Sequence, residues 1–261
     1  MEVSVFASGS GGNCLLVSGA GTDLLIDAGI SMRRTQAALA QSGHRIHEIS
    51  GVLITHEHSD HISGLNMLVK HYHFPVYAPR TVASRLSGQL PQIEEFLRVI
   101  PVGEPFAVGG LVVSAFHTPH DTDESVGYRV QGEGIYAHAT DMGCVTDEVL
   151  AGLQGADTVL IESNHDEQML SYGPYPVYLK RRILSDHGHL SNESCARLAR
   201  KLAVSGTTRI ILGHLSRENN RPELALEASR AAQAGTGAWL ACAPVSGCLQ
   251  VPVERRALCF R

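Results

Sequence analysis

The amino-acid sequence predicts an α/β protein in which two mixed β-sheets pack face to face, with helices covering the outside. Short apolar stretches, each typical of a buried strand, recur along the whole chain of 261 residues. The first stretches are separated by Gly-rich turns, which favours a meander of neighbouring strands. The later stretches alternate with segments of helical periodicity. A meander followed by strand–helix alternation fits two packed sheets with helices outside.

The elements of the first half follow from this pattern. Ser31 is typical of a helix N-cap, so a helix is expected at residues 32–42, closed by Gly43. A second helix is expected at residues 62–71. Apolar runs predict short strands at residues 3–7, 14–17, 24–26, 52–55, 111–116, 126–130 and 135–139.

The second half continues the alternation. Ser191 is the expected N-cap of a helix. Strands are expected at residues 158–162, 209–212 and 248–251, and helices at residues 147–153, 176–185, 192–204 and 222–233. Neither a repeat nor a linker interrupts the pattern, so residues 1–261 are expected to form a single domain.

Composition restricts the function classes. The net charge is −5, so nucleic acid could be bound only through local basic residues and not through the overall field. The amino terminus lacks a basic region followed by an apolar run, and no apolar run approaches the roughly 20 residues that cross a bilayer. The six cysteines show no CxxC pairing, which favours reduced thiols. We therefore expect a cytoplasmic protein without a membrane partner, whose oligomeric state the sequence does not give.

Histidine is unusually frequent, with 14 residues against 6 phenylalanines. Four candidate metal ligands fall within six residues in the pattern His56-x-His58-x-Asp60-His61, directly after an apolar strand. Imidazole and carboxylate groups suit Zn²⁺, Mn²⁺ or Fe²⁺. The alternative is a solvated loop that happens to be rich in histidine, but four ligand types at this spacing favour a metal centre.

This HxHxDH pattern resembles the signature of the metallo-β-lactamase superfamily, whose fold is an αββα sandwich. The resemblance implies a further histidine, a bridging aspartate and a last histidine, each at a strand end. His120, Asp141 and His214 follow apolar strands in this order. The implied centre has one metal held by His56, His58 and His120, a second held by Asp60, His61 and His214, and Asp141 bridging the two.

Two assignments within this pattern have alternatives. His117 lies nearer to the strand than His120, but the family pattern favours the pair His120-Asp121, which would make His117 a surface or supporting residue. Asp27 fits the superfamily's aspartate that steadies a ligand histidine, and is otherwise a carboxylate in a strand-end turn.

The type of bridging residue indicates the reaction class. The common zinc β-lactamases carry a cysteine in the second site, where this chain has Asp141, and the related di-iron proteins carry a glutamate where it has His58. The resemblance therefore implies a hydrolase. Two metals about 3.5–4 Å apart can lower the pKa of a bridging water toward neutrality and contact both the attacking and the leaving oxygen.

Longer motifs resemble a particular group of the superfamily. The segments SGSGGNC at residues 8–14, LIESNHD at 160–166, KRRILSDHGHLSN at 180–192 and GHLSRENN at 213–220 are similar to the YycJ (WalJ, VicX) group. The resemblance implies a single-domain nuclease acting 5′→3′ on DNA in preference to RNA, with two divalent ions, Mn²⁺ or Zn²⁺. The motifs fill the segment in which RNase J-like nucleases insert a β-CASP domain, and no tRNA-gripping arm of the tRNase Z type is recognisable.

Candidate contacts to a phosphate substrate lie in these motifs. The residues are Lys180, Arg181, Arg182, His165 and Arg217. Guanidinium and ammonium groups pair with phosphates, but a solvated helix face explains the three consecutive cations equally well. The Gly-rich segment 8–13 offers backbone N–H groups to an anion, or forms a plain hairpin turn.

A candidate general acid completes the catalytic residues. In tRNase Z a histidine that binds no metal is held by a glutamate, and Glu162 and His189 have a parallel spacing. Asp60 is counted with these two as catalytic. His189 could instead be an additional ligand or a phosphate donor, and His165 is a rival for the role of acid.

Three functions compete on the sequence alone. The first is a phosphodiesterase or nuclease, the second a small-molecule hydrolase of the glyoxalase II-like thioesterase or lactonase type, and the third a binding or regulatory module. The complete ligand set argues against a binding module. The motifs around Glu162 and His189 and the nearby basic residues argue against a small-molecule hydrolase.

Overall fold

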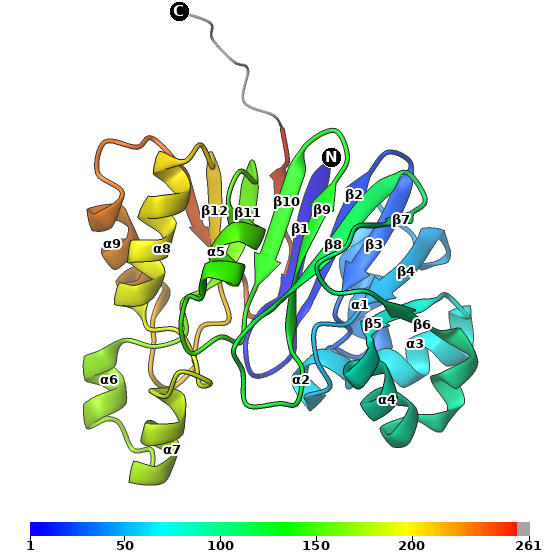
Figure 1. The fold of residues 1–261 in the computed structure, drawn as a ribbon, viewed down its shortest axis with the longest axis horizontal. Helices are drawn as coiled ribbons and strands as arrows, with labels where there is room; N and C mark the ends of the chain where they lie inside the picture. Colours follow the sequence, from blue (N-terminus) through cyan, green and yellow to red (C-terminus); the bar gives the residue numbers. More distant parts are fainter. Residues whose placement is uncertain (255–261) are drawn as a thin grey trace, which may run out of the picture.

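Two sheets of seven strands lie face to face in the computed structural model, which describes residues 1–254 (Figure 1). The first sheet has the order β14-β1-β2-β3-β4-β5-β6. Its strands are β1 (Glu2–Ala7), β2 (Cys14–Gly19), β3 (Thr22–Ile26), β4 (Ile49–Leu53), β5 (Val76–Pro79), β6 (Leu97–Ile100) and β14 (Leu249–Pro252). Strands β1, β2 and β3 form the expected antiparallel meander, and β3 to β6 run parallel.

The second sheet has the order β13-β12-β11-β10-β9-β8-β7. Its strands are β7 (Phe106–Val108), β8 (Leu111–His117), β9 (Val126–Gln131), β10 (Ile135–Ala139), β11 (Thr158–Glu162), β12 (Arg209–Gly213) and β13 (Trp239–Cys242). Strands β7 to β10 pair antiparallel, whereas β10 to β13 are parallel, so both sheets are mixed.

Helices cover the outer face of each sheet. Those on the first sheet are α1 (Met32–Gln41), α3 (Leu65–Tyr72) and α4 (Arg80–Gln89). Those on the second sheet are α5 (Asp147–Leu153), α8 (Asn192–Val204) and α9 (Pro222–Ala232). At the lower edge of Figure 1 lie three shorter helices, α2 (Ser59–Ile62), α6 (Glu167–Tyr172) and α7 (Val177–Ile183). Short 3₁₀ helices occupy Ile46–Glu48 and Pro91–Phe96.

Most side chains of the central strands are apolar and buried because both faces of each sheet are covered. In β3, Leu24 and Ile26 face the core between the sheets, whereas Leu25 faces the outer helices. This two-residue alternation places one side chain in each core. Tyr128 of β9 crosses the inner core, and its hydroxyl donates to the carbonyl of Ile54, just beyond β4, at 2.6 Å. The two sheets are thereby hydrogen-bonded next to the histidine-rich segment.

Most expected elements are confirmed, and so is the fold class. Ser31 and Ser191 cap their helices, since each hydroxyl accepts from the backbone N–H of the third residue that follows. The helix expected at residues 62–71 is confirmed as α3 but begins later than expected, because the chain turns at Gly64 between α2 and α3. A Cβ at Gly64 would lie 1.9 Å from the Ile30 carbonyl oxygen, so this turn depends on close backbone approach.

Besides α2 and the two 3₁₀ helices, six elements were not expected from the sequence. They are the short or amphipathic segments β5, β6, β7, α4, α6 and β13. Five cysteines are free thiols in the described range, and Cys259 lies outside it. Within residues 1–254 no helix combines the length and apolar character needed to cross a bilayer.

Candidate metal centre

The carboxyl ends of several strands meet at one edge of the two sheets, the lower edge in Figure 1. In the first sheet, β3 is followed by Asp27 and β4 by the histidine-rich segment that begins at His56. In the second sheet, Asp141 follows β10, Glu162 ends β11 and His214 follows β12. Each sheet therefore brings part of the site to a common edge, which is where ligands bind in open α/β sheets.

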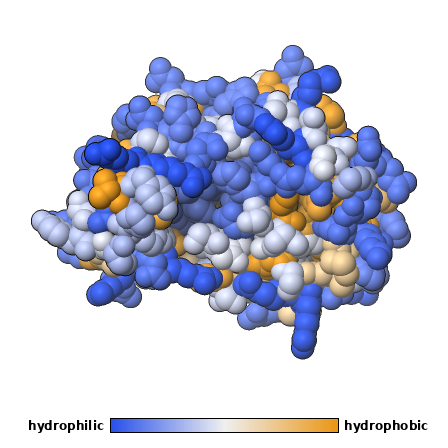
Figure 2. Space-filling view, turned by 90° about the horizontal axis from the view of Figure 1, so that it is seen from below, coloured by the Kyte–Doolittle hydropathy of each residue, from blue (hydrophilic) through white to orange (hydrophobic). Residues whose placement is uncertain are grey.

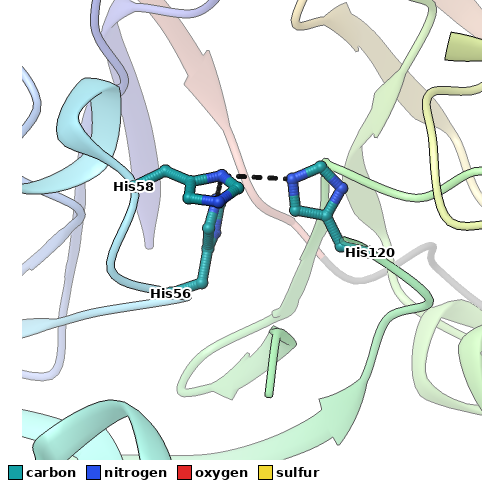
Figure 3. A group of neighbouring side chains, drawn as sticks. All are labelled: His56, His58 and His120. Carbon is teal, nitrogen blue, oxygen red and sulfur yellow. Dashed lines mark hydrogen bonds between the residues drawn. The ribbon is translucent and has the colours of Figure 1, made fainter. Parts of the chain in front are cut away.

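The first cluster consists of three histidines (Figure 3). His58 Nδ1 lies 3.1 Å from His56 Nε2 and 3.3 Å from His120 Nε2. His56 and His120 are buried and His58 is half-buried, so the cluster opens to solvent on the His58 side. Burial is the largest influence on the pKa of His56 and of His120 and keeps both below their usual value. A neutral imidazole is the form that binds a metal.

The second cluster adds carboxylates to histidines. Asp60 Oδ2 lies 3.6 Å from Nε2 of His61 and 3.6 Å from Nε2 of His214. Asp141 lies between the two clusters: its Oδ2 is 3.2 Å from His61 Nε2, and its Oδ1 is 3.5 Å from His214 Nε2 and 3.8 Å from His120 Nε2. One carboxylate thus faces histidines of both clusters, which is the arrangement expected of a bridging group.

This group of side chains fits divalent cations. The Oδ2 atom of Asp141 and the Nε2 atom of His214 are buried and lack a hydrogen-bond partner among residues 1–254. Buried polar atoms are normally paired, so these two atoms are suited to contact a bound cation. Imidazole nitrogens and carboxylate oxygens are also the donors that Zn²⁺ and Mn²⁺ accept.

The charges at the second cluster lead to the same conclusion. Burial would lower the pKa of His61, but the carboxylates of Asp27 and Asp141 outweigh it and raise this pKa to about 10. Burial is likewise outweighed at His214, whose pKa is raised chiefly by Asp141. The carboxylates therefore attract positive charge to this position, which protons supply when no metal ion does.

A second layer of contacts fixes the histidine-rich segment. Asp27 Oδ2 lies 2.7 Å from His61 Nδ1, and Asp27 Oδ1 accepts from the backbone N–H of Thr55 at 2.9 Å. The Asp27 carboxylate is therefore positioned to set the ring orientation and tautomer of His61, the role that the resemblance implies. Asn13 also contributes, since its Nδ2 lies 3.0 Å from His61 Nε2 and 3.3 Å from Asp60 Oδ2.

Glu162 holds two histidines at once. Its Oε1 lies 2.8 Å from His189 Nδ1 and 3.0 Å from His214 Nδ1. Its Oε2 accepts from the backbone N–H groups of Met142 and Leu190 at 2.9 and 3.2 Å. Glu162 is completely buried, which would raise its pKa, but the two histidines outweigh burial and keep this pKa low. The sequence predicts the contact with His189, whereas the contact with His214 emerges only from the structure.

A cavity of about 210 Å³ opens beside the clusters. His189 and His214 line it together with Ser10, Asp121, Asn164, Tyr175, Leu179, Arg182, Ile183, Gly188 and Ser216. The side chain of His189 is about one-quarter exposed, and its Nδ1 lies 3.8 Å from Asp141 Oδ1. Burial lowers the pKa of His189 and Glu162 raises it, with Glu162 prevailing. His189 is thus the partly exposed imidazole at the boundary between the clusters and the cavity.

Backbone strain concentrates at this edge. Asp27, Asp141 and His214 have φ angles of 60°, 56° and 54°, a left-handed conformation that residues other than glycine adopt rarely. Each follows a buried strand that is fixed on both sides. Such strain costs of order 1–3 kcal/mol per residue and is typical of functional sites. The geometry aims three site side chains inward at a cost in stability.

The remaining candidates lie in different surroundings. The side chain of His117 is 52% exposed and contacts Glu148 and Glu124, so it stays outside the clusters. His165 is buried with both ring nitrogens unpaired in the described range, and it does not line the cavity. Arg217 is exposed and lies against Gly11, where a Cβ would approach its Nη2 to 2.2 Å.

The three residues of the expected basic cluster make different contacts in the structure. Arg182 pairs with Asp121, next to His120, and lines the cavity. Lys180 donates to the carbonyl of Ser171 at 2.7 Å, so its ammonium is turned toward α6. Arg181 is exposed and forms no ion pair within residues 1–254.

Besides Asn13, three buried asparagines were missed as supporting residues. Asn164 Nδ2 donates to the carbonyl of His214 at 2.9 Å. Asn220 Nδ2 donates to the carbonyls of Ser163 and Asn164 and to Asn192 Oδ1. The motifs around residues 160–166, 189–192 and 213–220 therefore interlock through side-chain amides, which fixes the loops that carry Glu162, His189 and His214.

Comparison with known proteins identifies the family. Residues 22–215 match the β-lactamase superfamily domain. The exodeoxyribonuclease YycJ of Bacillus anthracis is 41% identical over 229 residues, which cover 86% of each chain. The exodeoxyribonuclease WalJ of Streptococcus pneumoniae is 36% identical over 228 residues, covering 86% of this chain and 85% of that one.

A solved structure gives the same fold. The Zn²⁺-bound PqqB of Methylobacterium extorquens superposes with a TM-score of 0.72 at 20% identity, covering 97% of this chain and 100% of that chain. The fold and the metal-binding geometry define a metallo-β-lactamase-fold protein. Within that superfamily, the chain belongs to the YycJ/WalJ family.

Proposed function

We propose that this protein is a metal-dependent exodeoxyribonuclease, since the two relatives described above are named exodeoxyribonucleases. The observation that carries the proposal is the position of Asp141, whose carboxylate faces histidines of both clusters beside a cavity lined by Arg182. A phosphodiester placed in this cavity would meet a guanidinium that pairs with phosphate oxygens. The alternative of a thioesterase or lactonase is not favoured by the relatives or by this cation.

The residues that would hold two ions are those of the two clusters. His56, His58 and His120 would hold one, Asp60, His61 and His214 the other, and Asp141 would contact both. The ions when bound, Zn²⁺ or Mn²⁺, would lower the pKa of a water molecule and neutralise the phosphate charge. Asp27 contacts Nδ1 of His61, and Glu162 contacts Nδ1 of His214. Each carboxylate would thereby orient one of these two rings for metal binding.

The chain's own acid would be His189. Hydrolysis of a phosphodiester releases an alkoxide, which needs a proton. Glu162 holds Nδ1 of His189, so the opposite ring nitrogen is free to donate a proton toward the cavity that His189 lines. Among residues 1–254, His165 has no hydrogen-bond partner on its ring nitrogens and does not line the cavity, which supports His189 over its rival.

The test is a degradation assay with loaded protein. Single- and double-stranded DNA and RNA, labelled at the 5′ or the 3′ end, are incubated with protein carrying Mn²⁺ or Zn²⁺. We expect degradation of DNA in preference to RNA, proceeding 5′→3′, and about two metal equivalents per chain by elemental analysis. Protein with two bound ions that hydrolyses bis-p-nitrophenyl phosphate but no nucleic acid would refute the nuclease proposal. A fully loaded sample that saturates at one ion would refute the pair of metal sites.

A further inference from the structure

The hydroxyl of Thr55 contacts one histidine of each candidate metal cluster. We propose that Thr55 is a positioning residue that connects Asp27 to His56, so that a single buried carboxylate orients a ligand in both metal sites: His61 directly and His56 through the threonine hydroxyl. This role rests on the two metal sites of the proposed function and adds to them a link through which one site influences the other.

Four short contacts surround this hydroxyl. Thr55 Oγ1 lies 3.1 and 3.0 Å from the two carboxylate oxygens of Asp27, 3.1 Å from Nδ1 of His56 and 3.2 Å from Nδ1 of His61. In Figure 2, which views this end of the molecule from below, the face is largely hydrophilic and hollowed beside the lobe at the left. The four side chains lie beneath such surface groups, since none is more than 3% exposed. Buried polar groups of this kind must satisfy one another, because solvent offers them no replacement partner.

The number of protons decides which group donates. A carboxylate only accepts, whereas a threonine hydroxyl has one proton and two lone pairs. The Thr55 hydroxyl therefore donates its proton to Asp27 and keeps a lone pair for an imidazole. Without Asp27 the hydroxyl could rotate and donate to the imidazole instead. The carboxylate thus makes Thr55 an acceptor toward His56.

His56 needs such an acceptor. Its Nε2 points toward His58 within the three-histidine cluster, 3.1 Å from Nδ1 of that ring (Figure 3). When Nε2 binds a metal ion, the neutral imidazole carries its single proton on Nδ1. That proton finds Thr55 Oγ1 at 3.1 Å. Thr55 therefore fixes both the tautomer and the rotation of the His56 ring.

The contact between Thr55 and His61 is secondary. Nδ1 of His61 lies 2.7 Å from Asp27 Oδ2, closer than the 3.2 Å to the hydroxyl, so its proton is given to the carboxylate. The other oxygen, Oδ1, accepts from the backbone N–H of Thr55 at 2.9 Å, which holds the carboxylate in place. Loss of the hydroxyl should therefore affect the first metal site, and loss of the carboxylate should affect both.

The other candidate ligands support this interpretation. Three further histidines turn Nε2 toward a cluster and have an oxygen acceptor at Nδ1. These acceptors are Asp27 for His61, the carbonyl of Gly188 for His120 and Glu162 for His214. Thr55 occupies the same position at His56. A hydroxyl differs from these three acceptors because it can also donate, so it needs Asp27 to fix its direction.

The test uses variants that keep every candidate ligand. They are Thr55→Val, which removes the hydroxyl at nearly constant shape, Thr55→Ser, which keeps it, Asp27→Asn, and the double variant Thr55→Val/Asp27→Asn. The control is Thr158→Val, because Thr158 is also completely buried but donates to the carbonyl of Pro252, at 3.2 Å, away from both clusters. Circular dichroism checks the fold of each protein. If Thr55→Val does not fold, Thr55→Ala replaces it in every comparison.

Metal affinity is the readout, so no nucleic acid is needed. The full chain loaded with Zn²⁺ is titrated with a coloured chelator, which gives a dissociation constant for each ion. The ion that is missing in His120→Ala identifies the first site, and the ion that is missing in His214→Ala identifies the second.

We expect Thr55→Val to raise the dissociation constant of the first ion roughly 10- to 100-fold, the usual effect of losing the partner of a ligand. The second ion should change less, because Asp27 still contacts His61. Thr55→Ser and Thr158→Val should match the wild type, and Asp27→Asn should weaken both ions. In the double variant the first ion should bind no more weakly than in Thr55→Val, because the link from Asp27 is already broken.

Each contrary result has a definite meaning. If the wild type binds two ions and Thr55→Val binds both unchanged, the positioning role is refuted while the metal pair stands. If Asp27→Asn weakens the first ion by the same factor with and without the hydroxyl, Asp27 acts by another route and the link is refuted. Failure of Thr55→Ser to restore binding would show a packing role and also overturn the proposal. If the wild type saturates at one ion, the pair of sites itself fails, and the link with it.

Discussion

The carboxylate of Glu162 lies 3.0 Å from Nδ1 of His214, and the same oxygen lies 2.8 Å from Nδ1 of His189. One buried side chain thus connects a candidate metal ligand with the candidate proton donor. The two functions are therefore coupled, because any change at Glu162 alters the orientation and the basicity of both rings.

Glu162→Gln should impair both functions together. The neutral amide removes the charge that orients the two imidazoles, and loss of such partners typically costs 10- to 100-fold in metal affinity or activity. We expect a higher dissociation constant for one of the two metal ions and a lower kcat, measured by metal titration and DNA degradation. Glu167→Gln, at an exposed position on α6, is the control and should leave both unchanged. Unaltered metal affinity in Glu162→Gln would show that its contact with His214 is dispensable.

The two neighbouring histidines after β8 should respond differently to substitution. His120 is buried against His58, whereas His117 is half-exposed against Glu148. His120→Ala should lower the metal content toward one equivalent per chain and abolish most activity, while His117→Ala should remain close to the wild type. Elemental analysis and the nuclease assay measure both effects. The reverse ranking would assign the ligand role to His117.

His189→Ala should separate metal binding from proton donation. We expect both metals to remain and kcat on DNA to fall roughly 10²- to 10⁴-fold, the usual contribution of a general acid. Most of this loss should disappear on bis-p-nitrophenyl phosphate, since p-nitrophenolate leaves without a proton. His187→Ala, at an exposed position two residues away, is the control. Equal losses on both substrates, or a missing metal ion, would contradict the assignment.

The basic residues of α7 should differ in their effects. Arg181→Ala should raise KM for DNA and make the salt dependence of binding less steep by about 0.7–0.9 logarithmic units per decade, because one phosphate contact is lost. It should leave hydrolysis of bis-p-nitrophenyl phosphate unchanged, whereas Arg182→Ala should slow that reaction as well, since Arg182 lines the cavity. Arg33→Ala, exposed on α1, is the charge-matched control. An unchanged salt dependence in Arg181→Ala would show that this residue does not contact a DNA phosphate.

Acid should destabilise the protein through His138. Burial lowers the pKa of this histidine on β10 from its usual 6.5 to about 4. Between these values the unfolded chain binds a proton that the folded chain does not, so the free energy of unfolding falls as the pH falls. Urea unfolding in the presence of chelator, between pH 7 and pH 4, should therefore give a less steep decline for His138→Gln than for the wild type. Parallel curves would contradict this prediction.

The sequence predicts the strand ends well and the loops between them poorly. The HxHxDH segment, Asp141 and His214 each follow a buried strand whose apolar run is visible in the sequence, so their common edge follows from the parallel direction of those strands. The break at Gly64 was not predictable, because its cause is the approach of a backbone carbonyl from a distant segment, Ile30.

The supporting amides were missed for a similar physical reason. Asn13 contacts His61 across 48 positions, and Asn164 contacts His214 across 50. Asparagine is common in any turn, so neither residue type nor spacing distinguishes a buried amide from a solvated one.

The distribution of candidate ligands over the two sheets has a mechanical consequence. The first sheet supplies His56, His58, Asp60 and His61, and the second supplies His120, Asp141 and His214. Neither sheet holds a complete set, so each bound ion would act as a cross-link between the two halves of the sandwich. The free energy of metal binding would then also stabilise the packing of one sheet against the other. The hydrogen bond from Tyr128 to Ile54 joins the sheets at the same place. A substitution at Tyr128 that disturbs the inner core would therefore weaken metal binding even though every candidate ligand is still present.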